Sequence, residues 1–114
     1  MPGRTVIFVT HGEESALRGA GSAALAAVAM DDRVDVFLVG PAVGPVVTAH
    51  DGDAEDPGAL LQQARRLGAR LVACSSSVVE QRIDLDEANR ALDAVAGWPT
   101  ILEWSRGVID RFSF

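Results

Sequence analysis

The residue with the clearest chemical potential is Cys74, the only cysteine among 114 residues. It ends the apolar run 70–74 and is followed directly by Ser75, Ser76 and Ser77. A cysteine at the carboxyl end of a buried strand can face the N-terminus of the next helix, where backbone N–H groups favour the thiolate. Such a thiolate is a nucleophile or a carrier of sulfur. The competing interpretation is a small apolar side chain that closes the core, the commonest fate of a lone cysteine.

His11 is the second candidate, because it follows the first apolar run in Thr10-His11-Gly12-Glu13. An exposed, neutral imidazole could accept a phosphoryl group or act as an acid–base group. The tripeptide resembles the phosphohistidine loop of mannose-type sugar-transport IIA domains. The chain has no counterpart of the serine- and glycine-rich loop that those domains place beside the histidine. A polar turn residue is therefore the simpler interpretation.

Two further patterns favour structural roles over binding sites. His50 and the acidic residues of segment 51–56 lack the spacing of a calcium loop, so we interpret them as a solvated acidic loop. Gly19 and Gly21 lie too far past the first strand to form a dinucleotide fingerprint, and they favour close helix packing instead. No metal site and no cofactor is predicted.

Composition limits the classes of function further. All ten basic residues are arginine, so a Schiff-base lysine and a Walker-type phosphate loop are excluded. The net charge of −6 argues against nucleic-acid binding, which needs a basic patch. No apolar run reaches the length of a membrane span. A single cysteine fits a reducing compartment, so we expect one cytoplasmic domain over residues 1–114.

The hydrophobic pattern predicts alternating strands and helices. Buried strands are expected at 5–9, 34–39 and 70–74, with a terminal strand at 108–114 and a short one near 95–98. Helices are expected at 13–30, from Asp56-Pro57 to Gly68, from Asp84 to residue 95, and from Thr100 to Gly107. Segment 42–56 is expected to be irregular, with one short helical turn.

This order predicts a three-layer α/β/α fold with a mostly parallel sheet of about five strands. In such sheets, chemistry gathers beyond the carboxyl ends of the strands. We therefore expect Cys74 to be the catalytic residue, with His11, Glu13, Ser75 and Ser76 as binding residues.

The helix at 13–30 carries a second expectation. From Gly19 to Met30 it contains no charged residue, whereas a helix that only covers a sheet keeps a charged outer face. Another subunit is the natural cover for such a helix, so we expect a homo-oligomer.

Four motifs carry a resemblance that spans nearly the whole chain. The alanine-rich helix begins Ser15-Ala-Leu, and the second strand reads Val36-Phe-Leu-Val-Gly-Pro-Ala-Val43. The third strand runs Leu71-Val-Ala-Cys-Ser-Ser-Ser77, and the chain ends in Ser113-Phe114. In this order and spacing, the motifs resemble the DsrE/DsrF-like (TusD-type sulfur-relay) family.

The resemblance implies a doubly wound α/β domain in cytoplasmic sulfur traffic, assembled as a trimer or hexamer. It implies that Cys74 accepts sulfane sulfur from a donor protein as a persulfide and passes it to an acceptor protein, without a metal or organic cofactor. Two alternatives remain open: a non-catalytic oligomeric interaction or regulatory module with an inert Cys74, and a phosphocarrier that uses His11.

Overall fold

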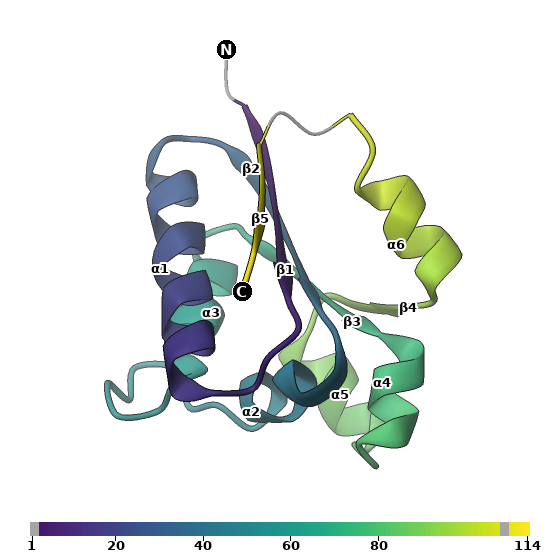
Figure 1. Ribbon diagram of the computed structural model, residues 1–114. Helices are drawn as coiled ribbons and strands as arrows, with labels where there is room; N and C mark the ends of the chain where they lie inside the picture. Colours follow the sequence, from purple (N-terminus) through teal and green to yellow (C-terminus); the bar gives the residue numbers. More distant parts are fainter. Residues whose placement is uncertain (1–2, 108–109) are drawn as a thin grey trace.

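A five-stranded parallel sheet forms the centre of the molecule in a computed structural model, which describes residues 3–107 and 110–114 (Figure 1). The strands lie in the order β4-β3-β2-β1-β5, and every pairing between neighbours is parallel. Their bounds are β1 Arg4–Val9, β2 Arg33–Leu38, β3 Arg70–Cys74, β4 Ala94–Ala96 and β5 Asp110–Ser113. The predicted α/β fold and the predicted strands near 5–9, 34–39 and 70–74 are confirmed.

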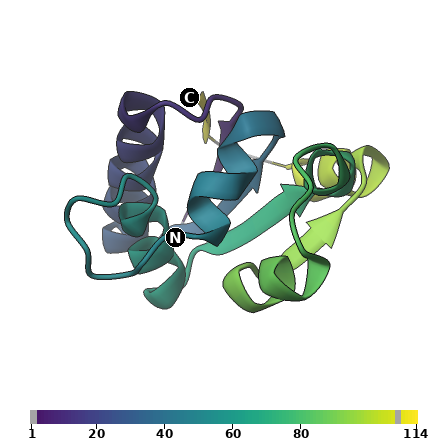
Figure 2. The same cartoon turned by 90° about the horizontal axis from the view of Figure 1, so that it is seen from below.

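Helices connect the strands and cover both faces of the sheet. In chain order they are α1 Glu14–Ala29, η1 Gly40–Ala42, α2 Val43–Val47, α3 Ala59–Arg66, α4 Ser75–Glu80, α5 Leu85–Ala91 and α6 Trp98–Trp104. Figure 2 shows α1 and α3 gathered on one side of the sheet and α6 on the other. The arrangement is the three-layer one that the sequence predicted.

Side chains alternate between the two faces along each strand, and each face has its own core. The face that we call the α1 face carries Ile7, Val36 and Leu71, and helices α1 to α5 all contribute buried side chains to it. The opposite face, which we call the α6 face, has a small core, and α6 is the helix of the described residues that covers it. The buried residues of that core are Val6, Phe37, Val72, Cys74, Ala96 and Ile101.

Segment 42–56 contains the one short helical turn that was predicted, α2, and the rest of the segment forms turns. Gly40, the first residue of η1, has a φ of +61° that a residue with a side chain rarely adopts, and η1 leads directly into α2. Val43 and Val46 of this segment are fully buried in the core of the α1 face. Burial of these side chains stabilises this short helix.

Three predicted helix bounds were wrong. The helix from Asp84 was extended too far, because Leu92 is already extended and β4 follows it to pair with β3. The last helix begins at Trp98 and not near Thr100, with Pro99 in its first turn. The helix after Asp56 begins only at Ala59, since the Asp56 carboxylate accepts hydrogen bonds in the turn before it.

The short strand expected near 95–98 is β4, one residue earlier, at Ala94–Ala96. In the terminal strand expected at 108–114, β5 occupies Asp110–Ser113, and residues 108 and 109 lie outside the described residues. β5 pairs with β1 and not with β4, so the chain crosses the whole sheet after α6.

Candidate functional site

Cys74 lies at the carboxyl end of β3, at the position that the sequence predicted. Its side chain points to the α6 face and is only 1% exposed, among the buried side chains of Val72, Ala96 and Ile101. Its backbone is extended, and α4 begins at the next residue, so Cys74 occupies the cap position of that helix. The strand end and the helix start thus coincide as expected, but the thiol faces the core and not the solvent.

The serines after Cys74 form the first turn of α4. Ser75 is half-buried, Ser76 is exposed, and Ser77 is buried, where its Oγ accepts a hydrogen bond of 2.7 Å from the Gly40 backbone N–H. This bond ties the carboxyl end of β2 to α4. A shallow hollow of about 380 Å³ lies on the outer side of the turn, lined by Ser75, Ser76, Val79 and Glu80. The two serines predicted as binding residues therefore line an open surface that adjoins the buried cysteine in sequence.

The structure places His11 and Glu13 away from the thiol. Both are exposed, and the His11 Nδ1 lies 3.1 Å from the Thr10 Oγ1 and 3.4 Å from the Phe114 carbonyl oxygen, on the β5 side of β1. Because β2 lies between β1 and β3, about two strand spacings, roughly 10 Å, separate these loops from Cys74. The carboxyl-end loops do touch one another, since a Cβ on Gly12 would lie 2.6 Å from the Pro41 carbonyl oxygen. His11 and Cys74 are thus on one edge of the sheet but not in one cluster.

A charged network that sequence reasoning missed lies at the other end of the α6 face. Asp35 is only 1% exposed, and its carboxylate accepts hydrogen bonds from Arg4 at 2.9 Å and from Arg70 at 2.9 Å. Arg4 also donates to the backbone carbonyls of Trp104 and Arg106 at the end of α6. The network therefore binds the carboxyl end of α6 to the start of β1 and β3.

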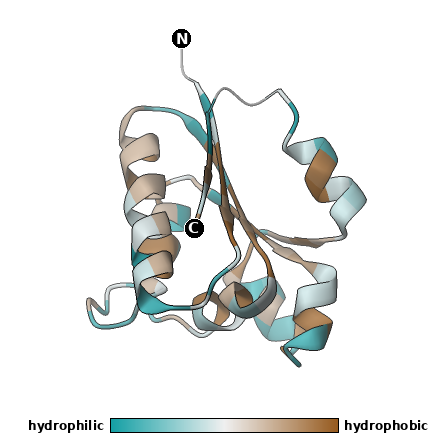
Figure 3. Ribbon diagram, viewed as in Figure 1, coloured by the Kyte–Doolittle hydropathy of each residue, from teal (hydrophilic) through white to brown (hydrophobic). Residues whose placement is uncertain are grey.

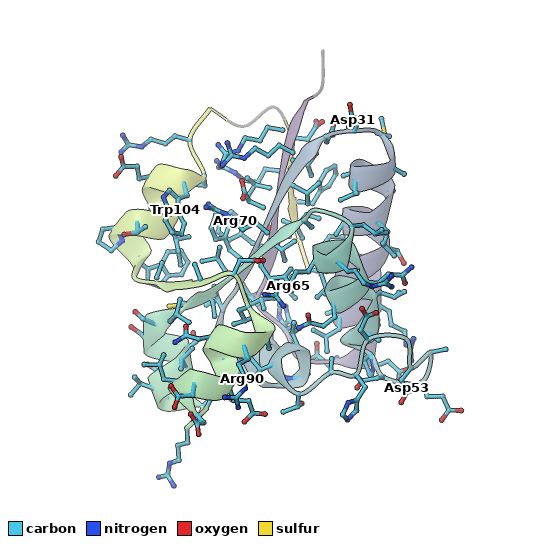
Figure 4. All side chains as sticks on the ribbon, turned by 180° about the vertical axis from the view of Figure 1, so that it is seen from behind. Asp31, Asp53, Arg65, Arg70, Arg90 and Trp104 are labelled. Atoms are coloured by element: carbon cyan, nitrogen blue, oxygen red, sulfur yellow. The ribbon has the colours of Figure 1, made fainter. Side chains whose placement is uncertain are left out.

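Arg70 and Trp104 complete this network. The Arg70 guanidinium lies over the Trp104 ring, 4.3 Å from its centroid, and Figure 4 shows the two side chains pointing toward one another. A guanidinium this close to an indole face is attracted by the ring quadrupole. The sequence carried a signal for this cluster, because β1, β2 and β3 each begin with an arginine. Only the register, which sets Asp35 beside Arg70, shows what these arginines bind.

The acidic segment that the sequence interpreted as a solvated loop is exposed from His50 to Glu55. Asp51 accepts a 2.7 Å hydrogen bond from Arg66, and this bond, with the charge of the carboxylate, raises the pKa of the Arg66 guanidinium. Arg18 holds the far side of the loop by donating to the carbonyls of Ala54 and Glu55. Within residues 3–107 and 110–114, no three histidine, cysteine or acidic side chains are grouped as metal ligands.

These features define a class of protein: a small, doubly wound α/β domain with a lone cysteine at the carboxyl edge of its sheet. No helix in the described ranges is both long and apolar enough to cross a membrane.

The chain belongs to the DsrE/DsrF-like family, whose match covers residues 4–106. Comparison with curated proteins gave no match. Among solved structures, the crystal structure of the ychN protein from E. coli superposes with a TM-score of 0.73 at 15% sequence identity. The superposition covers 98% of this chain and 99% of that chain. At this identity, the likeness establishes a common fold.

Proposed function

We propose that this chain is a cytoplasmic sulfur carrier that holds sulfane sulfur as a persulfide on Cys74. The observation that carries the proposal is the place of Cys74 in the fold. It ends β3 at the carboxyl edge of a parallel sheet, where such folds bind their ligands, in a chain of the DsrE/DsrF-like family.

The chemistry is a transfer without net oxidation or reduction. The Cys74 thiolate attacks the terminal sulfur of a donor persulfide, the S–S bond of the donor breaks, and the donor leaves as a thiolate. The new S–S bond on Cys74 is broken in turn when an acceptor thiolate attacks the terminal sulfur. The partners are thus a sulfur donor protein and an acceptor protein. The assembly in which they meet is a homo-oligomer, a trimer or hexamer by the resemblance of the sequence.

Access is the condition that this proposal must meet. A thiol that is 1% exposed cannot meet a donor, so either α6 or the first turn of α4 must move before sulfur is transferred. Burial holds α6 less firmly than α4, because Ile101 is the one buried side chain of α6, whereas Ser77 and Val78 of α4 are both buried. The hollow beside Ser75 and Ser76 would then receive the donor next to the uncovered thiol.

The burial of Cys74 itself favours a second candidate function, a non-catalytic oligomeric module. In that case the thiol is a small apolar side chain of the α6 face, and the activity of the protein resides in its surfaces. The two candidates make opposite predictions about the native thiol.

The test is to treat the native protein with polysulfide and to measure its intact mass. The sulfur-carrier proposal predicts a gain of sulfur that reductant removes and that Cys74→Ser abolishes. Alkylation under native conditions, with denatured protein as the reference, measures the exposure of the thiol separately. If the native thiol gains no sulfur and is alkylated only after the protein unfolds, the sulfur-carrier proposal fails. The non-catalytic oligomeric module then becomes the proposed function.

A further inference from the structure

Few buried side chains hold α6 on the sheet. Ile101 is its one buried residue, and Trp104 packs only partly against the core of the α6 face. A helix of seven residues is not stable by itself in water, because nucleation of its first turn is unfavourable. The helical form of α6 therefore depends on the contacts that fix it to the sheet.

Polar contacts at the carboxyl end of α6 supply much of its attachment. Arg4 of β1 donates to the backbone carbonyls of Trp104 and Arg106. The last carbonyls of a helix have no partner within the helix, so a guanidinium there satisfies them and opposes the negative end of the helix dipole. Arg70 of β3 contacts the same end of α6 through the Trp104 ring. Two arginines from different strands thus bind the last turn of α6.

One buried carboxylate orients both arginines. The Asp35 Oδ2 accepts from the Arg4 Nη2 at 2.9 Å, and the Asp35 Oδ1 accepts from the Arg70 Nε at 2.9 Å. Asp35 is almost completely buried, so solvent screens its charge little and it fixes the two guanidinium groups in place. Within residues 3–107 and 110–114, Arg33 makes no hydrogen bond to α6, although it lies 3.8 Å from the same carboxylate. We call the contacts of Asp35, Arg4 and Arg70 with the end of α6 the latch.

The latch and the thiol lie at opposite ends of one strand. Arg70 and Cys74 are the first and last residues of β3, so roughly 13 Å of strand separates them. The start of α6 adjoins the thiol, since Ala96 pairs with Cys74 and α6 begins two residues later. From there α6 runs back over this face, which Figure 3 shows with the apolar part of the helix in brown. Ile101, midway along α6, belongs to the same core cluster as Cys74, so release of the latch frees the side chain that covers the thiol.

The first turn of α4, which also adjoins the thiol, is fixed in a different way. Ser77 and Val78 are buried, and the Ser77 Oγ accepts a 2.7 Å hydrogen bond from the Gly40 N–H. α4 also follows Cys74 without an intervening residue, so it cannot move unless the end of β3 moves with it. α6 is therefore the element that can separate while the sheet stays intact.

We propose that Arg4 and Asp35 are positioning residues that control access to Cys74. They hold α6 closed over the thiol. When the contacts of Arg4 with Trp104 and Arg106 break, α6 separates from the sheet while the strands remain paired. The inference rests on the proposed function for the purpose of this opening, since the sulfur donor reaches the thiol only in the open form. The control acts from the far end of β3, so neither positioning residue touches the sulfur.

The sharpest test is Arg4→Met with Arg33→Met as its matched control. Arg4 and Arg33 pair in register as the first residues of β1 and β2, and both lie near Asp35. Of the two, Arg4 is the one that donates to α6 in the described part of the chain. We expect the rate at which iodoacetamide alkylates native Cys74 to rise about tenfold or more in Arg4→Met. Arg33→Met should stay near the wild-type rate.

The urea dependence of alkylation separates release of α6 from loss of global stability. Opening of one short helix exposes little surface, so the rate in Arg4→Met should rise with urea much less steeply than the equilibrium constant of global unfolding. Both tryptophans of the chain, Trp98 and Trp104, lie in α6, so their fluorescence should change in Arg4→Met. Arg4→Lys keeps the charge beside Asp35 but replaces the guanidinium fork with one ammonium group, so its alkylation rate should lie between those of Arg4→Met and the wild type.

A measurement on the wild type keeps the test independent of whether Arg4→Met folds. The Ser105 N–H donates to the Ile101 carbonyl at the end of α6, and the Gln81 N–H donates to the Ser77 carbonyl at the end of α4. If α6 opens by itself, amide hydrogen exchange should be faster at Ser105 than at Gln81. The free energy of opening from Ser105 should equal that from alkylation of the thiol.

Three results would overturn the proposal. They are a folded Arg4→Met variant whose thiol is alkylated at the wild-type rate, an alkylation rate with the full urea dependence of global unfolding, and wild-type exchange at Ser105 that is as slow as at Gln81. Polysulfide treatment of the same proteins separates this inference from the proposed function. If Arg4→Met is alkylated rapidly but gains no sulfur, the latch is supported and the sulfur-carrier proposal fails. If the wild type gains sulfur and Arg4→Met leaves the alkylation rate unchanged, the sulfur carrier is supported and the latch fails.

Discussion

The two faces of the sheet are built in different ways. On the α1 face, five helices bury a continuous core in which Leu17, Leu61 and Leu71 are almost completely inaccessible. On the α6 face, one seven-residue helix covers five buried side chains of the sheet with its own Ile101, and Arg4 of the network around Asp35 secures the end of that helix. The lone cysteine lies on the second face. Access to its thiol therefore depends on the less heavily covered half of the molecule. Substitutions that weaken the packing of each face in turn test this difference.

The largest effect is expected from Asp35→Ala. Removing this carboxylate leaves Arg4 and Arg70 partly buried without their acidic partner, and breaking a buried pair from one side costs about 3–5 kcal/mol. Urea unfolding should show the loss. Arg33→Ala is the control, because Arg33 is 67% exposed and lies 3.8 Å from the same carboxylate. Its loss should stay within about 1 kcal/mol, and equal losses for the two variants would contradict the assigned network.

Ile101→Ala in α6 and Leu61→Ala in α3 compare the helices that pack on the two faces of the sheet. Each should cost about 2–5 kcal/mol of unfolding free energy, because both side chains are fully buried. If α6 opens by itself, only Ile101→Ala loosens the route to the thiol, so native alkylation of Cys74 should speed up about tenfold or more. Leu61→Ala should leave that rate near the wild-type value. Equal acceleration in both variants would show that the thiol is reached only by global unfolding.

Gly21→Ala tests how closely the α1 face is packed. The added methyl group would meet the Leu60 Cβ at 2.4 Å and the Leu61 backbone nitrogen at 3.1 Å, so α1 and α3 must separate. The expected cost is about 1–3 kcal/mol, in spite of the better helix propensity of alanine. Gly19→Ala, which meets only the movable ring of Phe114, should be close to neutral in thermal unfolding. A stabilised Gly21→Ala would show that the two helices are not in close contact.

The smallest effect is expected from the cap of α5. The Asp84 carboxylate accepts a 2.8 Å hydrogen bond from the Asp86 N–H, and Asp84→Ala should cost about 1 kcal/mol in chemical denaturation. Asn89→Ala, at an exposed position of the same helix, should change stability by no more than about 0.5 kcal/mol. α5 lies on the α1 face, so neither variant should alter the alkylation of Cys74.

Local patterns predicted most of the fold. The apolar runs that became β1, β2 and β3 are buried on both faces, and the helix predicted to start at Asp84 is capped by the Asp84 carboxylate. Helix bounds were missed where tertiary contacts override local signals. The helix from Asp84 ends before residue 95 because β4 pairs with the edge of β3.

The candidate site, like the fold, could be predicted only in part from the sequence. The position of Cys74 at a strand end, followed at once by a helix, was visible in the sequence, as was the polar turn around His11. The separation of His11 from Cys74 could not be seen in the sequence, because it depends on β2 lying between β1 and β3. The network around Asp35 was hidden for a similar reason, since its arginines come from three different strands.

The sequence by itself determined the order of the elements, the parallel α/β class and the family, because each rests on periodicity and motifs within short stretches of chain. Tertiary structure alone decided that the thiol of Cys74 faces the core beneath α6 and that the last strand joins β1. Both depend on pairings between residues far apart in the chain. A shift of one residue in such a pairing would turn every side chain of the strand to the other face.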